Sequence, residues 1–124
     1  MILVDTSVWV DHLRRGDTAL ALALNAGTVA VHPFVVGELA CGQLKARQQI
    51  LSLLASLPRM QPATDDETLY FLEHHRLHGR GLGYIDVHLL AAALLHTDTR
   101  LWTRDRRLKA VAVELGVDRQ GSSH

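Results

Sequence analysis

The chain has 124 residues, and its 13 basic and 13 acidic side chains give a formal net charge of +0. This length suits one compact domain, expected at 1–118 and followed by a disordered tail at 119–124. A single cysteine, Cys41, excludes an intrachain disulfide and a Cys-rich zinc site. The apolar runs are too short to span a bilayer, and no basic region precedes the apolar N-terminus as it would in a signal peptide. We therefore expect a cytoplasmic protein without a membrane association.

The first third of the chain alternates short apolar runs with amphipathic segments. An apolar run that ends in an acid predicts a buried first strand, and the helical spacing of the apolar residues after it predicts a helix. Pro33 favours the first turn of a further helix. The expected elements are a strand at 2–5, helices at 6–15 and 20–24, a strand at 29–31 and a helix at 34–40.

The rest of the chain is mainly helical in its pattern. Thr64 and Glu67 match the spacing of a capping box, which predicts a helix start. The expected elements are helices at 45–57, 64–78, 84–96 and 105–115, an extended piece near Met60 and a strand at 101–103. The helix at 84–96 is almost wholly apolar and should be buried on most sides. Short apolar strands separated by helices predict an α/β sandwich around a parallel sheet.

Four acidic residues interrupt these apolar segments. Asp5 ends the first strand, and Asp105 follows the strand at 101–103 by two residues. Since ligand sites in such folds lie at the carboxyl ends of the strands, we expect both acids on one rim of the sheet. Asp86 lies in the first turn of an apolar helix after a glycine-rich loop, and Glu38 lies within the helix that follows the second strand. Burying a carboxylate is costly unless it is paired or bound to a metal.

Four carboxylates on one rim would repel one another and raise one another's pKa values. A hard divalent cation removes that conflict, because Mg²⁺ and Mn²⁺ prefer oxygen ligands. Such an ion can activate a water molecule and neutralise the charge that develops on a phosphate. The chain has no glycine-rich phosphate loop of the kind found in nucleotide-triphosphate or NAD enzymes. The pattern therefore favours phosphodiester hydrolysis.

Four short motifs occur in the order found in one nuclease family. They are Ile-Leu-Val-Asp-Thr-Ser-Val-Trp at 2–9, Val-Gly-Glu-Leu at 36–39, Tyr-Ile-Asp at 84–86 and Leu-Trp-Thr-Arg-Asp-Arg-Arg-Leu at 101–108. Their order and spacing resemble PIN-domain nucleases, and the compact length is similar to that of the VapC toxins of bacterial toxin–antitoxin modules. The resemblance covers nearly the whole chain.

The resemblance implies a PIN-like three-layer α/β/α sandwich with a central parallel sheet of four or five short strands. It implies an endoribonuclease that uses Mg²⁺ or Mn²⁺, in which a metal-activated water hydrolyses RNA and leaves a 5′-phosphate and a 3′-hydroxyl. It also implies two protein partners, a cognate antitoxin that blocks the site and a second copy of the chain in a homodimer.

The resemblance further implies roles for individual residues. The catalytic acids are Asp5, Glu38, Asp86 and Asp105. Asp5 and Asp86 are the main metal ligands, with the other two acids acting in part through water. Supporting hydroxyl groups are expected from Thr6, Ser7 and Thr103. Arg104 and Arg106 are expected to contact RNA phosphates, although both also fit ordinary exposed charges beside a strand end.

Other interpretations of these residues stay open from the sequence. Asp5 and Asp105 also occupy helix N-cap positions, Asp86 suits the first turn of any helix, and Glu38 could face solvent. His74 and His78, four residues apart on the expected helix at 64–78, could face one zinc ion, although no third ligand is evident beside them.

Two other functions compete with the nuclease. One is a non-catalytic PIN-like module that only binds RNA or a protein, and the complete set of acids argues against it. The other is an aspartyl-phosphate protein, either a receiver domain or a dehalogenase-like phosphatase. That phosphatase needs a second acid two residues after its nucleophile, where this chain has Ser7.

Overall fold

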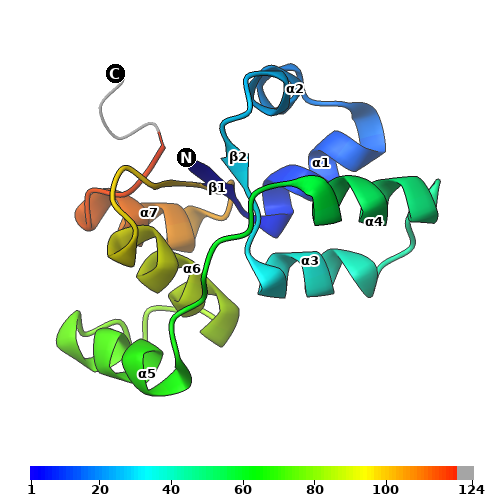
Figure 1. The fold of residues 1–124 in the computed structure, drawn as a ribbon. Coiled ribbons are helices and arrows are strands. Elements are labelled where there is room, and N and C mark those ends of the chain that lie inside the picture. The colour runs from blue at the N-terminus through cyan, green and yellow to red at the C-terminus, as the bar shows by residue number, and fades with distance from the viewer. Residues whose placement is uncertain (120–124) are drawn as a thin grey trace.

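The computed structural model describes residues 1–119, so residues 120–124 of the expected tail lie outside the described part. Figure 1 shows short central strands with helices on both sides. The elements, in chain order, are β1 (Ile2–Val4), α1 (Thr6–Arg15), α2 (Thr18–Asn25), β2 (Val29–Ala30), α3 (Pro33–Ala40), α4 (Arg47–Ser56), α5 (Asp65–His74), α6 (Tyr84–Leu95), β3 (Arg100–Trp102) and α7 (Arg106–Glu114).

The sheet is parallel, with β1 in the middle and the strand order β2-β1-β3. Single-residue bridges extend it on both edges, from Val31 to Arg59 and from Leu101 to Asp118. The expectation of four or five strands is therefore wrong for residues 1–119, which form three, because each outer segment pairs through one residue only. The extended piece expected near Met60 is present, and the Met60 N–H donates to the Val31 carbonyl at 2.8 Å.

The core lies between the sheet and its flanking helices. Leu3 and Val4 of β1 and Trp9 of α1 have no exposed surface. Helix α6 is buried continuously from Val87 to Ala93 and contacts both α5 and β3. The prediction of a buried helix there is confirmed, and its burial places Asp86 at the edge of the core.

Helix α5 begins at the predicted place and ends early. Its capping box is complete, with the Glu67 N–H donating to Thr64 Oγ1 at 3.0 Å and the Thr64 N–H donating to Glu67 Oε1 at 2.8 Å. The prediction that it reaches residue 78 is wrong, because the helix ends at His74 and Arg76 adopts a positive φ of 54°. His78 therefore lies outside the helix, which removes the premise of a zinc site on one helical face.

The described fold continues one residue past the boundary expected at 118. The Arg119 N–H donates to the Leu101 carbonyl at 2.9 Å, and its guanidinium lies 3.8 Å from the centroid of the Trp102 ring. Within residues 1–119, no helix combines the length and the hydropathy needed to cross a membrane.

Candidate active site

Asp5 occupies the carboxyl end of the central strand and is nearly buried, with 7% of its surface exposed. Its Oδ2 accepts hydrogen bonds from Ser7 Oγ at 2.8 Å and from Thr103 Oγ1 at 2.7 Å. Although Asp5 stands at the N-cap position of α1, its side chain makes no capping hydrogen bond. The simple interpretation of Asp5 as a helix cap is therefore wrong. Its carboxylate is instead oriented by two hydroxyl groups from different elements.

The same hydroxyl groups connect Asp5 to the loop that follows β3. The backbone N–H of Arg104 donates to Ser7 Oγ at 3.0 Å, and the backbone N–H of Asp105 donates to Thr103 Oγ1 at 3.1 Å. Thr103 is buried, with 4% of its surface exposed. Each of these hydroxyl groups thus donates to Asp5 and accepts from a loop N–H, so hydrogen bonds connect the loop directly to the Asp5 carboxylate.

Asp105 caps α7, as the alternative interpretation of this residue predicted. Its Oδ1 accepts a hydrogen bond from the Leu108 N–H at 3.0 Å, and the residue is exposed. Only one carboxylate oxygen makes this bond. The capping role therefore leaves the other oxygen available to a ligand.

Asp86 lies in the first turn of α6 and is partly buried. Its Oδ2 accepts a hydrogen bond from the Gly83 N–H at 2.9 Å, which closes the turn between the glycine-rich loop and the helix. Burial raises the pKa of Asp86 against the lowering effect of that hydrogen bond, and the negative charges of the other three acids raise it further. Each of the other three predicted acids is therefore close enough to Asp86 to act on it electrostatically.

Glu38 differs from the other acids in its surroundings. It is exposed on α3, and its Oε1 accepts a hydrogen bond from Thr6 Oγ1 at 2.6 Å. The argument that each acid needs a partner because it is buried holds for Asp5, partly holds for Asp86 and fails for Glu38 and Asp105. What links the four acids is the effect of the other three charges on Asp86, and not a common burial.

The chemistry of the cluster fits a hard cation. Within residues 1–119, no arginine, lysine or histidine forms an ion pair with any of the four acids. In the same residues, no three Asp, Glu, His or Cys side chains form a compact group of metal ligands. An ion held by one or two carboxylates together with water suits this arrangement, as is usual for Mg²⁺.

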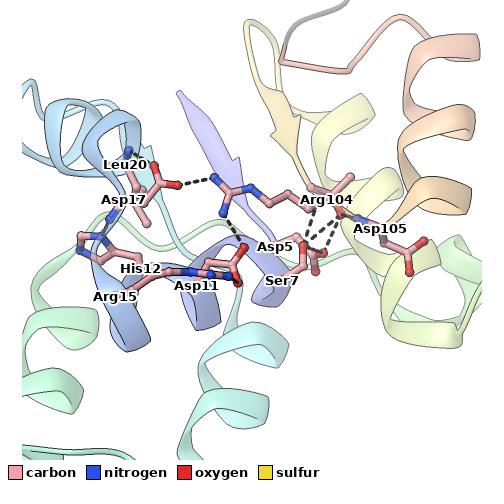
Figure 2. Close-up of polar contacts among 10 residues, drawn as sticks. Asp5, Ser7, Asp11, His12, Arg15, Asp17, Leu20, Arg104 and Asp105 are labelled. Carbon is pink, nitrogen blue, oxygen red and sulfur yellow. Dashed lines mark hydrogen bonds and ion pairs between the residues drawn. The ribbon is translucent and has the colours of Figure 1, made fainter.

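The structure gives Arg104 two acidic partners that the sequence did not predict. Its guanidinium forms ion pairs with Asp11 of α1, at 2.6 Å, and with Asp17, the N-cap residue of α2 (Figure 2). These hydrogen bonds lower the pKa of both carboxyl groups. Both terminal nitrogens of the guanidinium are therefore already engaged by carboxylates. Sequence reasoning missed the two partners because they lie 93 and 87 residues away.

Other cations lie beside Asp105. Arg106 and Arg107, in the first turn of α7, line an open hollow of about 760 Å³ together with Arg104 and Asp105. In the described part of the chain neither of these two arginines forms an ion pair. Arg106 is exposed as expected, and Arg107 joins it as a second available cation.

Comparisons with known proteins agree with this architecture. Residues 2–114 match the family model described as "PIN domain". The chain is 49% identical over 117 residues to "Ribonuclease VapC32" of two Mycobacterium tuberculosis strains, CDC 1551 and H37Rv, covering 94% of this chain and 94% of each relative. The crystal structure of PAE2754 from Pyrobaculum aerophilum superposes with a TM-score of 0.60 at 19% identity, over 93% of this chain and 94% of that one, which supports the fold alone. The chain therefore belongs to the PIN-domain family, among relatives of the VapC type.

Proposed function

We propose that this protein is a VapC-type toxin, an endoribonuclease that depends on Mg²⁺ or Mn²⁺ and hydrolyses RNA at the acids Asp5, Glu38, Asp86 and Asp105. The observation that carries the proposal is the arrangement of the acids: Asp5 is nearly buried and held by two hydroxyl groups, Asp86 is held by the Gly83 N–H, and the other three acids raise the pKa of Asp86. Several negative charges gathered around one carboxyl group are unfavourable without a cation. The ribonuclease name of the 49% identical relative supports the same activity.

The donor atoms assign different tasks to the acids. Asp5 and Asp86 would hold the metal directly, because their carboxylates are oriented by hydrogen bonds and at least partly withdrawn from solvent. Glu38 and Asp105 are exposed and would act partly through water. When bound, the ion would supply an activated water and neutralise negative charge on the phosphate.

The neighbouring hydroxyl groups keep the acids in place. Ser7 and Thr103 donate to the same oxygen of Asp5, which leaves Oδ1 outside this network, and Thr6 donates to Glu38. Hydrogen bonds of this kind fix the orientation of a ligand before substrate arrives. Arg106 would contact RNA phosphates beside Asp105, with Arg107 as its neighbour.

We also propose an antitoxin as a protein partner. A pocket of about 310 Å³ opens beside Glu38, and its mixed lining includes the apolar side chains Val10, Leu13, Leu39 and Ile50. An apolar segment of an antitoxin bound there would cover one of the acids and so block cleavage. The VapC name of the relatives supports a partner of this class.

A homodimer is the second proposed assembly. Helices α5 and α6 expose the apolar side chains Leu69, Tyr70, Leu94 and Leu95, which a second copy of the chain could cover. Light scattering of the purified protein measures the assembly, and a monomer at micromolar concentration would contradict the dimer.

The direct test of the activity is cleavage of total cellular RNA by the purified protein with Mg²⁺, with Mn²⁺ and with EDTA. We expect discrete fragments that carry a 5′-phosphate, that depend on the metal and that disappear in Asp86→Asn. This substitution keeps the size of the side chain and an oxygen for the Gly83 N–H while it removes the charge.

The matched control is Asp98→Asn. Asp98 is an exposed residue before β3, at the opposite end of that strand from Asp105, and its positive φ of 61° is tolerated by asparagine. This variant should cleave like the wild type. RNA that stays intact under every metal condition, with an antitoxin shown to be absent, would refute the nuclease and favour a binding module.

A further inference from the structure

The loop that links β3 to α7 is held through both parts of Arg104. Its side chain bridges Asp11 and Asp17, while its backbone N–H donates to Ser7 Oγ at 3.0 Å. Figure 2 shows the guanidinium turned toward α1 and α2, away from Asp5 and Asp105. One residue thus ties the loop to two helices that lie nearly 90 residues earlier in the chain.

Both anchors of the guanidinium are themselves held in place. Asp17 uses Oδ1 to accept the Leu20 N–H at 2.9 Å, which leaves Oδ2 for Arg104. Asp11 lies within α1, so the helix backbone fixes its position. The side chains of Arg104 and Asp17 are 37% and 16% exposed, so the contact is partly shielded from water. An arginine whose two terminal nitrogens donate to two different fixed carboxylates makes a specific and directional link.

The segment that this link holds carries two components of the candidate site. Thr103, immediately before Arg104, donates to Asp5 at 2.7 Å, and Asp105, immediately after it, is one of the four acids. A shift of the loop would therefore change the orientation of Asp5 and the position of Asp105 together. Misplacement of reacting groups by about 1 Å can cost on the order of 100-fold in rate.

We propose that Arg104 is a positioning residue, which holds Thr103 and Asp105 against Asp5 through its ion pairs with Asp11 and Asp17 and does not bind RNA. This inference rests on the proposed function for its kinetic consequence, although the geometry of the loop can be measured without any activity.

The first variant is Arg104→Ala, assayed by steady-state cleavage of a single-stranded RNA with Mg²⁺. We expect kcat to fall by roughly 10- to 100-fold, with KM changed by less than about threefold, because the acids are misplaced while the RNA contacts remain. An arginine that gripped a phosphate would give the opposite result. KM would rise, and the dependence of RNA affinity on salt would weaken by a slope of about 0.7 on a double-logarithmic plot.

The second variant, Asp17→Asn, separates the two roles more sharply. Asparagine caps helices about as well as aspartate, so α2 keeps its N-cap while Arg104 loses a charged partner. Positioning predicts a loss of kcat as in Arg104→Ala, whereas phosphate binding predicts a lower KM, because the arginine is freed. Arg15→Ala is the matched control. It removes another cation from Asp11, at a side chain that is 75% exposed and makes no contact with the loop, and it should leave kcat unchanged.

Amide hydrogen exchange gives a measurement that does not depend on cleavage. The N–H groups of Arg104 and Asp105 are hydrogen-bonded to Ser7 and Thr103, so they should exchange at least about tenfold faster in Arg104→Ala and Asp17→Asn, and not in Arg15→Ala. Wild-type exchange and wild-type kcat in both variants would overturn the inference. A wild-type protein that cuts no RNA would instead refute the proposed function, and the exchange rates would still decide the role of Arg104.

Discussion

The stability of this protein should depend on pH through one buried histidine. His32 has no exposed surface and caps α3, where its Nδ1 accepts the Phe34 N–H at 3.1 Å. Its Nε2 is buried and has no hydrogen-bond partner among the described residues. Burial lowers the pKa of His32 most, and the positive charges of His88 and Arg59 add to the effect, so that it falls from 6.5 to about 4. The folded protein therefore keeps this ring neutral over a range in which the unfolded chain would protonate it.

The size of the effect follows from the difference between the two pKa values. Between pH 6.5 and about 4 the unfolded state binds one more proton at His32 than the folded state. The contribution of neutral His32 to the free energy of unfolding is therefore fully present above pH 6.5 and is lost as the pH decreases toward 4. The difference of about 2.5 pKa units corresponds to roughly 3 kcal/mol. That is a large part of the 5–15 kcal/mol typical of a whole domain.

Urea unfolding at pH values from 4 to 8 measures this loss. Other groups titrate in the same range, so the informative quantity is the difference between the wild type and His32→Asn, which keeps an N-cap oxygen and cannot titrate. We expect His32→Asn to be less stable at pH 8, because the ring packing is lost, and to show a smaller loss of stability toward pH 4. His78→Asn, at an exposed histidine, controls for the removal of a histidine. Parallel pH curves for the wild type and His32→Asn would refute the reasoning.

Three further predictions follow from the site and the fold. Thr103→Val should lower kcat about tenfold while the protein stays folded by circular dichroism, because Asp5 loses one of its two hydroxyl donors, and Thr103→Ser should restore most of the rate. Mn²⁺ should raise the melting temperature of the wild type and not that of Asp5→Asn; equal shifts would place the ion elsewhere. Thr64→Ala should cost about 1 kcal/mol in urea unfolding with cleavage unchanged, because it removes the cap of α5 and touches none of the acids.

The features that could be predicted from sequence are those with a local cause. An apolar run that ends in an acid predicted that Asp5 lies at a strand end. The rule for parallel sheets then predicted that it shares a rim of the sheet with Asp105. The buried helix α6 followed from its composition alone. The hydrogen bond between Asp86 and Gly83 also has a local cause, because the two residues are three positions apart in the chain.

The features that could not be predicted depend on tertiary packing. The end of α5 at His74 has no nearby glycine or proline to mark it, because the chain turns through Arg76 at a positive φ. The exposure of Glu38 depends on which face of α3 meets α1 and α4, which one sequence does not determine. The outer edges of the sheet pair through single residues at Arg59 and Asp118, too short a segment for the alternating pattern of a strand.

The orientation of Arg104 explains how the four acids stay without an ion pair among the described residues, although the loop that carries Asp105 also carries a cation. Arg104 is adjacent to Asp105 in sequence and close to Asp5 through Ser7, so a guanidinium turned toward the sheet would neutralise either carboxylate and compete with a metal ion. Asp11 and Asp17 hold it in the other direction. The two aspartates therefore do more than anchor a loop. They keep the Arg104 guanidinium away from Asp5 and Asp105, and so preserve the negative charge that the proposed metal ion would need.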